Sequence, residues 1–92
     1  MGSEILDEVF EVIRGRMQHP REGSYVCRLI SEGRTAEKVM EECKELIESA
    51  ESGEKEHIVH EAADLFFHSM VLIAEKGVDL EEVMEELRRR RR

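Results

Sequence analysis

The sequence contains no tryptophan, and proline, cysteine and aromatic residues are scarce: of its 92 residues one is proline, two are cysteine and 4% are aromatic. Much of the chain consists instead of Glu, Leu, Ala, Arg and Met, which are good helix formers. No stretch alternates polar and apolar residues with the period of two that a half-buried strand requires. The sequence therefore predicts an all-α fold and gives no support to folds built on sheets.

Long apolar runs, a signal sequence and a CxxC pair are also missing. The longest apolar stretches fall far short of the roughly 20 residues that span a bilayer. We therefore expect a cytoplasmic protein without membrane association, whose Cys27 and Cys43 are reduced thiols. Cys43 falls on the apolar side of a predicted helix, and we expect it to pack in the core.

Acidic residues outnumber basic residues by 22 to 14, which gives a formal net charge of −8. This charge argues against nucleic-acid binding, because a nucleic-acid surface must be basic to displace counterions. The run from Arg88 to Arg92 stands apart and can bind phosphate, although such a run at a helix end more often complements the helix dipole. An acidic protein that handles a polyphosphate needs a compensating charge, for which a divalent cation is the simplest source.

The length of the chain indicates one domain, residues 1–92. A chain of this size buries only about 60–65% of the surface that its unfolded form exposes, so its own core is marginal. Because partner subunits often supply the missing burial, we expect a homo-oligomer.

Helical periodicity predicts a bundle of about five helices with short connections. The first covers residues 4 to about 17 and ends before His19-Pro20, since proline disfavours helical geometry in the residue before it. Ser24 is a suitable N-cap for a short second helix, which Gly33 ends.

The remaining three helices are separated by glycines. Thr35 can cap a third helix that runs to about residue 52, where Gly53 breaks the pattern. A fourth, roughly residues 54–76, is the longest and most apolar. Asp79 and Glu82 then form an Asp-x-x-Glu start, close to a capping box, for the fifth.

Two carboxylate clusters are candidates for chemistry, Glu41-Glu42-x-x-Glu45 on the third helix and Glu61-x-x-Asp64 on the fourth. Residues three or four apart share a helix face, so each cluster directs its oxygens to one side. An antiparallel hairpin of the two helices would let the clusters meet. The first cluster can equally be an ordinary solvated face, since Glu41 and Glu45 lie opposite the apolar side of their helix.

The second cluster is harder to explain as a solvated face. The fourth helix is apolar around most of its circumference, and Glu61, Asp64 and His68 form a narrow polar strip along it. Buried carboxylates need a balancing cation, unless the strip faces water or pairs with a neighbouring helix. Oxygen ligands favour Mg²⁺, with Mn²⁺ also possible. A di-iron site would need Glu-x-x-His on two helices, and the sequence has one, Glu54-x-x-His57.

The spacing of these acids is similar to the signature of the all-α NTP pyrophosphatase (MazG-like) superfamily. More narrowly, the chain resembles the phosphoribosyl-ATP pyrophosphatase family. Met40 departs from the pattern, because the family usually has glycine there. The resemblance rests on four segments in order, namely Val9-Phe10-Glu11-Val12-Ile13 with Arg16, Glu22-Gly23-Ser24-Tyr25, Lys38-Val39-Met40-Glu41-Glu42, and residues 53–87 around Glu61-Ala62-Ala63-Asp64-Leu65 and His68.

The resemblance implies a homodimeric, Mg²⁺-dependent enzyme that hydrolyses 1-(5-phosphoribosyl)-ATP to 1-(5-phosphoribosyl)-AMP and pyrophosphate, the second step of histidine biosynthesis. It implies that Glu42, Glu45, Glu61 and Asp64 are catalytic and, with Glu41, hold the metal. Candidate substrate contacts are Lys38, Arg16 and His68. Two alternatives remain at this point: a house-cleaning NTP pyrophosphatase of the same superfamily, and a non-enzymatic helical dimerisation module.

Overall fold

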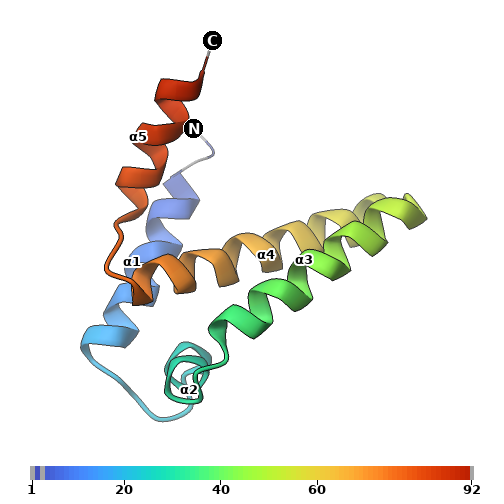
Figure 1. The fold of residues 1–92 in the computed structure, drawn as a ribbon. Coiled ribbons are helices and arrows are strands. Elements are labelled where there is room, and N and C mark those ends of the chain that lie inside the picture. The colour runs from blue at the N-terminus through green and yellow to red at the C-terminus, as the bar shows by residue number, and fades with distance from the viewer. Residues whose placement is uncertain (1, 3, 92) are drawn as a thin grey trace.

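The computed structural model describes residue 2 and residues 4–91, and over these residues the chain is all-helical, as predicted. Its five helices appear in Figure 1 and are α1 (Glu4–Gln18), α2 (Tyr25–Ser31), α3 (Thr35–Ser52), α4 (Lys55–Glu75) and α5 (Leu80–Arg90). None of these helices combines the length and the apolar character that crossing a bilayer would require.

Most helix ends follow the residues that predicted them. The Ser24 side chain accepts a hydrogen bond from the backbone of Cys27 at the start of α2. Gly53 ends α3 in the left-handed conformation, with φ of 77°, which glycine adopts without steric cost. Asp79 and Glu82 form the reciprocal capping box at the start of α5.

The predicted cap at Thr35 is wrong. Arg34 occupies the N-cap position of α3 and makes no side-chain capping bond, whereas Thr35 is the first residue of the helix. The Thr35 side chain turns into the protein, where only 2% of the residue is exposed. Its hydroxyl oxygen has no hydrogen-bond partner, so tertiary packing and not local capping fixes the start of α3.

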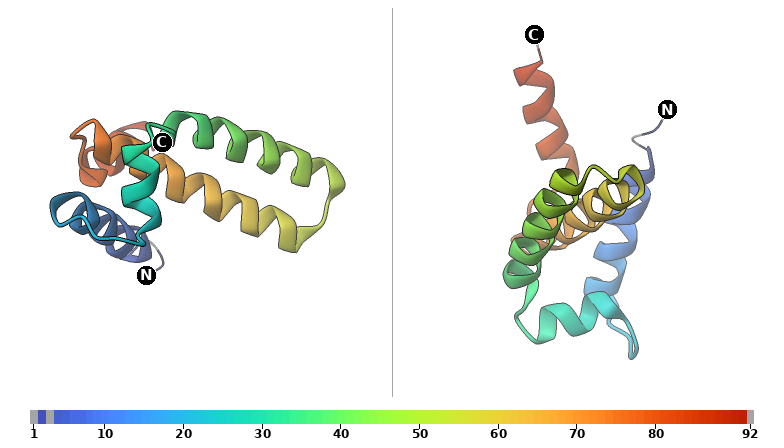
Figure 2. Two further views of the ribbon diagram at one scale, coloured as in Figure 1. Left: turned by 90° about the horizontal axis from the view of Figure 1, so that it is seen from below. Right: turned by 90° about the vertical axis from the view of Figure 1, so that its right-hand side faces the viewer.

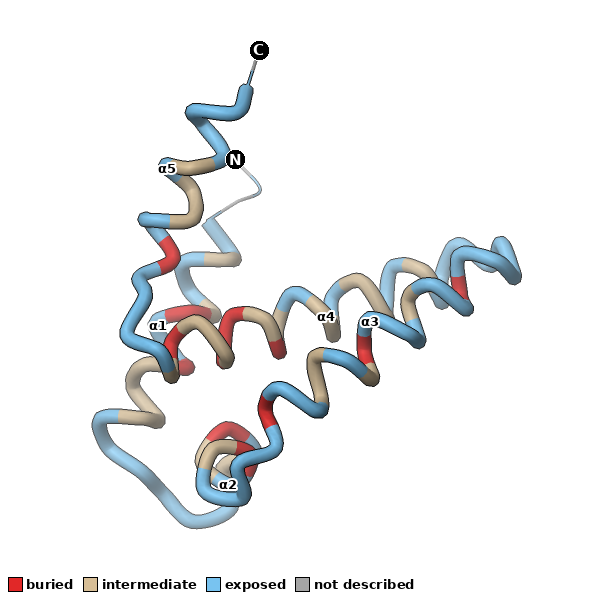
Figure 3. Tube along the Cα trace, in the orientation of Figure 1, coloured by how far each residue is buried: buried red, intermediate tan, exposed pale blue. Residues whose placement is uncertain are grey.

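The hydrophobic core lies at one end of the molecule, where α1, α2 and α5 meet the C-terminal half of α4. Figure 3 shows the buried residues concentrated there. Phe10 and Ile13 of α1 pack with Val71 of α4, and Ile13 and Val71 are completely enclosed. The other members of the core are Val26, Leu29, Met70, Ala74 and Leu80.

Helices α3 and α4 form an antiparallel hairpin that projects from this core, and Figure 2 shows them side by side with the other helices at one end. The projection gives the chain a Cα radius of gyration of 14.2 Å, against about 12 Å for an average compact domain of this length. The far end of the hairpin is mostly exposed (Figure 3).

The orientation of α3 corrects a second prediction. The residues of α3 that are buried are Thr35, Glu42 and Ser49, which recur every seven residues and therefore share one face. The apolar side of the helix points elsewhere: Met40 and Ile47 are 76% and 56% exposed. Cys43 lies on that side and is exposed, so the prediction that it packs in the core is wrong for a single chain.

Candidate active site

The hairpin brings the acidic patches of α3 and α4 together. Carboxylate oxygens of Glu42 and Glu45 from α3 and of Glu61 from α4 all lie within 4.8 Å of one another. The antiparallel turn at Gly53 produces this meeting, because it places the middle of one helix beside the middle of the other. We call Glu42, Glu45 and Glu61 the acid cluster.

The acid cluster is partly withdrawn from water. Only 4% of Glu42 is exposed, and Glu61 is half-buried. One oxygen of each, Glu42 Oε1 and Glu61 Oε1, is buried without any hydrogen-bond partner. A buried carboxylate oxygen without a partner costs free energy, so these two oxygens favour a bound cation.

The electrostatics of Glu45 reflect the crowding of negative charge. The charge of Glu42 is the largest cause that raises the pKa of the Glu45 carboxyl above its ordinary value. Partial desolvation, a hydrogen bond with Glu42 and the charge of Glu61 add to this effect, and Lys38 opposes it. Like charges close together disfavour ionisation in this way.

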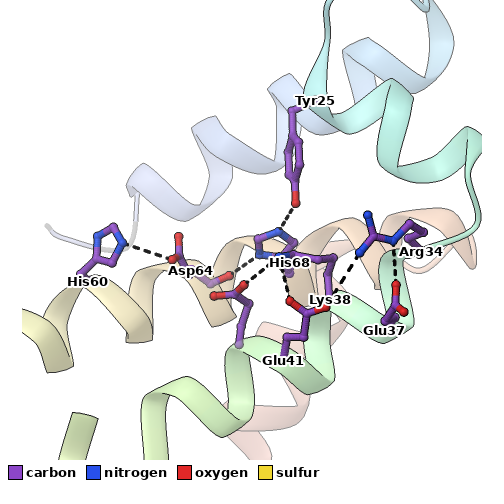
Figure 4. A network of polar contacts seen from close by, with 9 residues as sticks. Tyr25, Arg34, Glu37, Lys38, Glu41, His60, Asp64 and His68 are labelled. Atoms are coloured by element: carbon purple, nitrogen blue, oxygen red, sulfur yellow. Dashed lines mark hydrogen bonds and ion pairs between the residues drawn. The ribbon is translucent and has the colours of Figure 1, made fainter. Parts of the chain in front are cut away.

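Lys38 and Glu41 lie at the edge of the acid cluster. The Lys38 ammonium is 3.2 Å from Glu41 Oε1 and 3.3 Å from Glu42 Oε2. Glu41 also lies 3.9 Å from the guanidinium of Arg34, and it belongs to neither group of potential metal ligands among the described residues. The structure therefore places Glu41 with basic side chains, as Figure 4 shows, and not with the other acids.

Asp64 lies in a second, adjoining group. Its carboxylate, the carboxylate of Glu61 and the imidazole of His60 offer ligand atoms within 4.8 Å of one another. His60 Nε2 is 3.4 Å from Asp64 Oδ2 (Figure 4). Glu61 thus belongs to both groups, and the four acids predicted as catalytic form two overlapping sets.

His68 is turned inward and connects α4 to α2. Its Nδ1 is 2.8 Å from the backbone oxygen of Asp64, and its Nε2 is 2.7 Å from the Tyr25 hydroxyl (Figure 4). Because a carbonyl can only accept, Nδ1 donates to the Asp64 oxygen. Only 6% of His68 is exposed. In the structure this predicted substrate contact connects Tyr25 of α2 to the helical turn of α4 that contains Asp64.

Arg16 lies away from the acid cluster. It lines a cavity of about 580 Å³ between α1 and α2, together with Arg21 and Arg28, and no member of the acid cluster contributes to that lining. A single chain therefore does not unite Arg16 with the predicted metal ligands.

The C-terminal arginines are engaged within their own helix. Arg88 pairs with Glu81 and Glu85 at 2.8 Å, while Arg89 and Arg90 both pair with Glu86. Arg92 lies outside the described residues. These pairs indicate that most of the run stabilises α5.

The donor set fits a hard divalent cation. The acid cluster offers carboxylate oxygens, which Mg²⁺ and Mn²⁺ prefer. Lys38 is paired with Glu42, and three carboxylates around one ammonium retain an excess of negative charge that a divalent ion can neutralise.

The family of the chain is decided by comparison with known proteins. A family model described as phosphoribosyl-ATP pyrophosphohydrolase matches residues 6–91. The chain belongs to this family. The phosphoribosyl-ATP pyrophosphatase of Methanocella arvoryzae is 45% identical over 94 residues, which cover 98% of this chain and 99% of that protein. The phosphoribosyl-ATP pyrophosphatase of Methanopyrus kandleri is 44% identical over 96 residues, 97% of this chain and 96% of that protein.

The chain also matches part of a longer protein. The histidine biosynthesis bifunctional protein HisIE of Caldanaerobacter subterraneus is 41% identical over 91 residues, which cover 97% of this chain but 44% of that protein. The family resemblance predicted from the motifs and the all-α fold class are both confirmed.

Two residues of the site were missed in the sequence. His60 is not among the predicted site residues, although its i,i+4 spacing to Asp64 predicts contact on a helix. Tyr25 was recognised in a family motif, but nothing in its spacing predicts that it meets His68, which is 43 residues away in sequence.

Proposed function

We propose that this chain hydrolyses 1-(5-phosphoribosyl)-ATP to 1-(5-phosphoribosyl)-AMP and pyrophosphate, the second step of L-histidine biosynthesis. The family and its relatives named phosphoribosyl-ATP pyrophosphatase support this proposal. The observation that supports it structurally is the meeting of Glu42 and Glu45 with Glu61, where one oxygen of Glu42 and one of Glu61 are buried without a hydrogen-bond partner. The substrate is accordingly a small molecule, and the site of action we propose is the cytoplasm.

The reaction breaks the bridge between the α and β phosphorus atoms. Water forms a new P–O bond, pyrophosphate leaves with the bridging oxygen, and the proton of the attacking water passes to a base. Glu42, Glu45 and Glu61, with Asp64 adjoining, would hold Mg²⁺. When bound, the ion would neutralise charge and polarise the phosphoryl oxygens.

The side chains of the chain itself have separate roles in this proposal. Lys38, held between Glu41 and Glu42, presents an ammonium to the phosphates beside the acid cluster. Its hydrogen bond to Glu41 is the largest cause that raises its pKa, so it remains charged. Glu45 is exposed at the rim, and its raised pKa suits it to accept a proton from water.

We further propose that the enzyme is a homodimer in which a second copy covers the apolar sides of α3 and α4. Met40 and Ile47 on α3, and Val59 and Phe66 on α4, are each more than half exposed. In each helix the two residues are seven apart and so share a face. Soluble monomers rarely leave large apolar surfaces exposed, and a self-complementary contact about a twofold axis is the commonest remedy.

The proposed substrate is tested by comparing the rates of pyrophosphate release from phosphoribosyl-ATP, ATP and dNTPs with purified protein and Mg²⁺. We expect kcat/KM for phosphoribosyl-ATP to exceed the others by at least about a hundredfold, since a contact to a substrate group contributes a few kcal/mol. Equal values for all nucleotides would assign the chain to the house-cleaning pyrophosphatases. The absence of pyrophosphate release from every substrate would leave a dimerisation module.

A further inference from the structure

His60 extends the acid cluster along α4 with a nitrogen donor. Its imidazole lies one helical turn before Asp64, with Nε2 3.4 Å from Asp64 Oδ2. Both residues, together with Glu61, offer ligand atoms within 4.8 Å of one another. Figure 4 shows the ring of His60 turned toward the Asp64 carboxylate.

The buried oxygens behind His60 point to a ligand and not merely to a surface pair. Glu61 is shared by the His60 group and the acid cluster. Its Oε1 is buried without a partner, as is Oε1 of Glu42, a residue that is only 4% exposed. A salt bridge between His60 and Asp64 leaves the Glu61 oxygen unsatisfied, whereas a cation held by Glu61 would satisfy it; the Glu42 oxygen lies in the acid cluster, which shares Glu61 with the His60 group.

We propose that His60 is a nitrogen ligand to the cation held by Glu61 and Asp64, and that it shifts the preference of this site from Mg²⁺ toward Mn²⁺. The proposal rests on the cation of the proposed function but not on the identity of the substrate. Mg²⁺ favours oxygen ligands and releases its water reluctantly. Mn²⁺ also prefers oxygen ligands, but as a first-row transition ion it accepts an imidazole among them more readily than Mg²⁺ does.

The ordinary explanation of the same geometry is a solvated ion pair. The side chains of His60 and Asp64 are 72% and 39% exposed, and i,i+4 pairs on helix surfaces contribute only a few tenths of a kcal/mol. The two explanations differ in whether the imidazole nitrogen is bonded to the metal, which can be observed directly.

The experiment loads the full chain with one equivalent of Mn²⁺ and records electron spin-echo envelope modulation, which detects ¹⁴N bonded to the ion. We expect imidazole modulation in the wild type and its loss in His60→Ala. His57→Ala is the matched control, because His57 is also an exposed histidine of α4 but belongs to neither ligand group. Since the His60 side chain is largely exposed, its removal leaves the fold intact, which circular dichroism verifies.

Titration with Mn²⁺ and Mg²⁺ supplies the second readout. We expect His60→Ala to bind Mn²⁺ at least about tenfold more weakly, which is the loss that removing even an outer partner of a metal ligand causes. Its affinity for Mg²⁺ should change much less.

Three results would overturn the inference. They are wild-type protein that binds Mn²⁺ without nitrogen modulation, modulation that persists in His60→Ala, and equal Mn²⁺ affinities of the two proteins. None of these results would affect the proposed hydrolysis, which requires a cation but not a nitrogen ligand. Failure of the wild type to bind any Mn²⁺ or Mg²⁺ would instead remove the cation from both proposals.

Discussion

Glu42 and Glu45 are three residues apart on α3, yet the fold treats them differently. Glu42 is buried between the arms of the hairpin, and Glu45 is exposed at its rim. The spacing in the sequence predicted that both could approach Glu61, because residues three apart share a helix face. It could not predict which one would be buried, since the rotation of α3 depends on packing partners that a helical wheel does not contain.

The raised pKa of Glu45 gives a prediction for stability without metal. The folded protein holds the Glu45 proton more tightly than the unfolded chain does, so this group favours folding below its unfolded pKa and loses that contribution as the pH rises through its folded pKa. At pH 7, which lies above the ordinary pKa of glutamate, this group therefore opposes folding. In the presence of a chelator, we expect Glu45→Gln to have a higher Tm than the wild type at pH 7, and the difference to vanish near about pH 3, where glutamate is almost fully protonated in both states.

Glu48→Gln is the control for this measurement, because Glu48 is an exposed glutamate of the same helix outside the acid cluster. Its Tm should follow the wild type at both pH values. A lower Tm of Glu45→Gln at pH 7, or a difference that does not depend on pH, would show that the crowding of charge at Glu45 is not as described.

At the scale of helices, capping residues and glycines in the sequence predicted the helix ends well where the end is fixed by local side-chain and backbone interactions. The capping box of Asp79 and Glu82 and the left-handed Gly53 are short-range features that depend on neighbouring residues alone. Thr35 failed because its hydroxyl had two possible environments, and burial in the tertiary structure prevailed over capping. The prediction that Cys43 packs in the core was wrong for a similar reason, since the periodicity of an apolar helix face does not show what covers that face.

Thr35 also provides a test at this scale. Its buried hydroxyl has no partner, so replacing it with the nearly isosteric valine removes a polar group that gains nothing from burial. We expect Thr35→Val to leave the free energy of unfolding unchanged or to raise it by about 1 kcal/mol, measured by denaturant titration.

Ser24→Ala is the comparison for Thr35→Val, because the Ser24 side chain does cap α2. This variant should lose about 1 kcal/mol, the usual contribution of an N-cap. A loss of the same size in Thr35→Val would show that the Thr35 hydroxyl does cap α3, against the structure, in which Arg34 occupies the N-cap position.

The shape of the whole molecule supports the proposed dimer. The α3–α4 hairpin extends beyond the core, and its apolar sides are exposed. The length of the chain predicted a homo-oligomer and the family resemblance a homodimer; the exposed apolar sides of α3 and α4 are the surface on which we propose that a second copy fits. Arg16 lines a cavity to which the acid cluster contributes no residue, and its role as a substrate contact stays a prediction.

The proposed dimer is tested by placing charge on this surface. We expect the double substitution Met40→Glu with Ile47→Glu to convert a dimer to a monomer in light scattering coupled to size exclusion, because both side chains would bury a charge in the interface. Lys55→Glu, at an exposed position on the same hairpin, should remain dimeric. If the wild type is a monomer, or if the Met40→Glu, Ile47→Glu double variant remains a dimer, this surface is not the dimer interface.

The measurement that bears most directly on the acid cluster is Mg²⁺-dependent release of pyrophosphate from phosphoribosyl-ATP by Glu61→Gln and Asp64→Asn, with Glu48→Gln as the control. Glu61 is the carboxylate that both ligand groups share, so its neutralisation should abolish pyrophosphate release, and Asp64→Asn should do the same, while both retain their helical circular dichroism. Glu48→Gln should keep wild-type activity. Near wild-type activity in folded Glu61→Gln and Asp64→Asn would contradict the account.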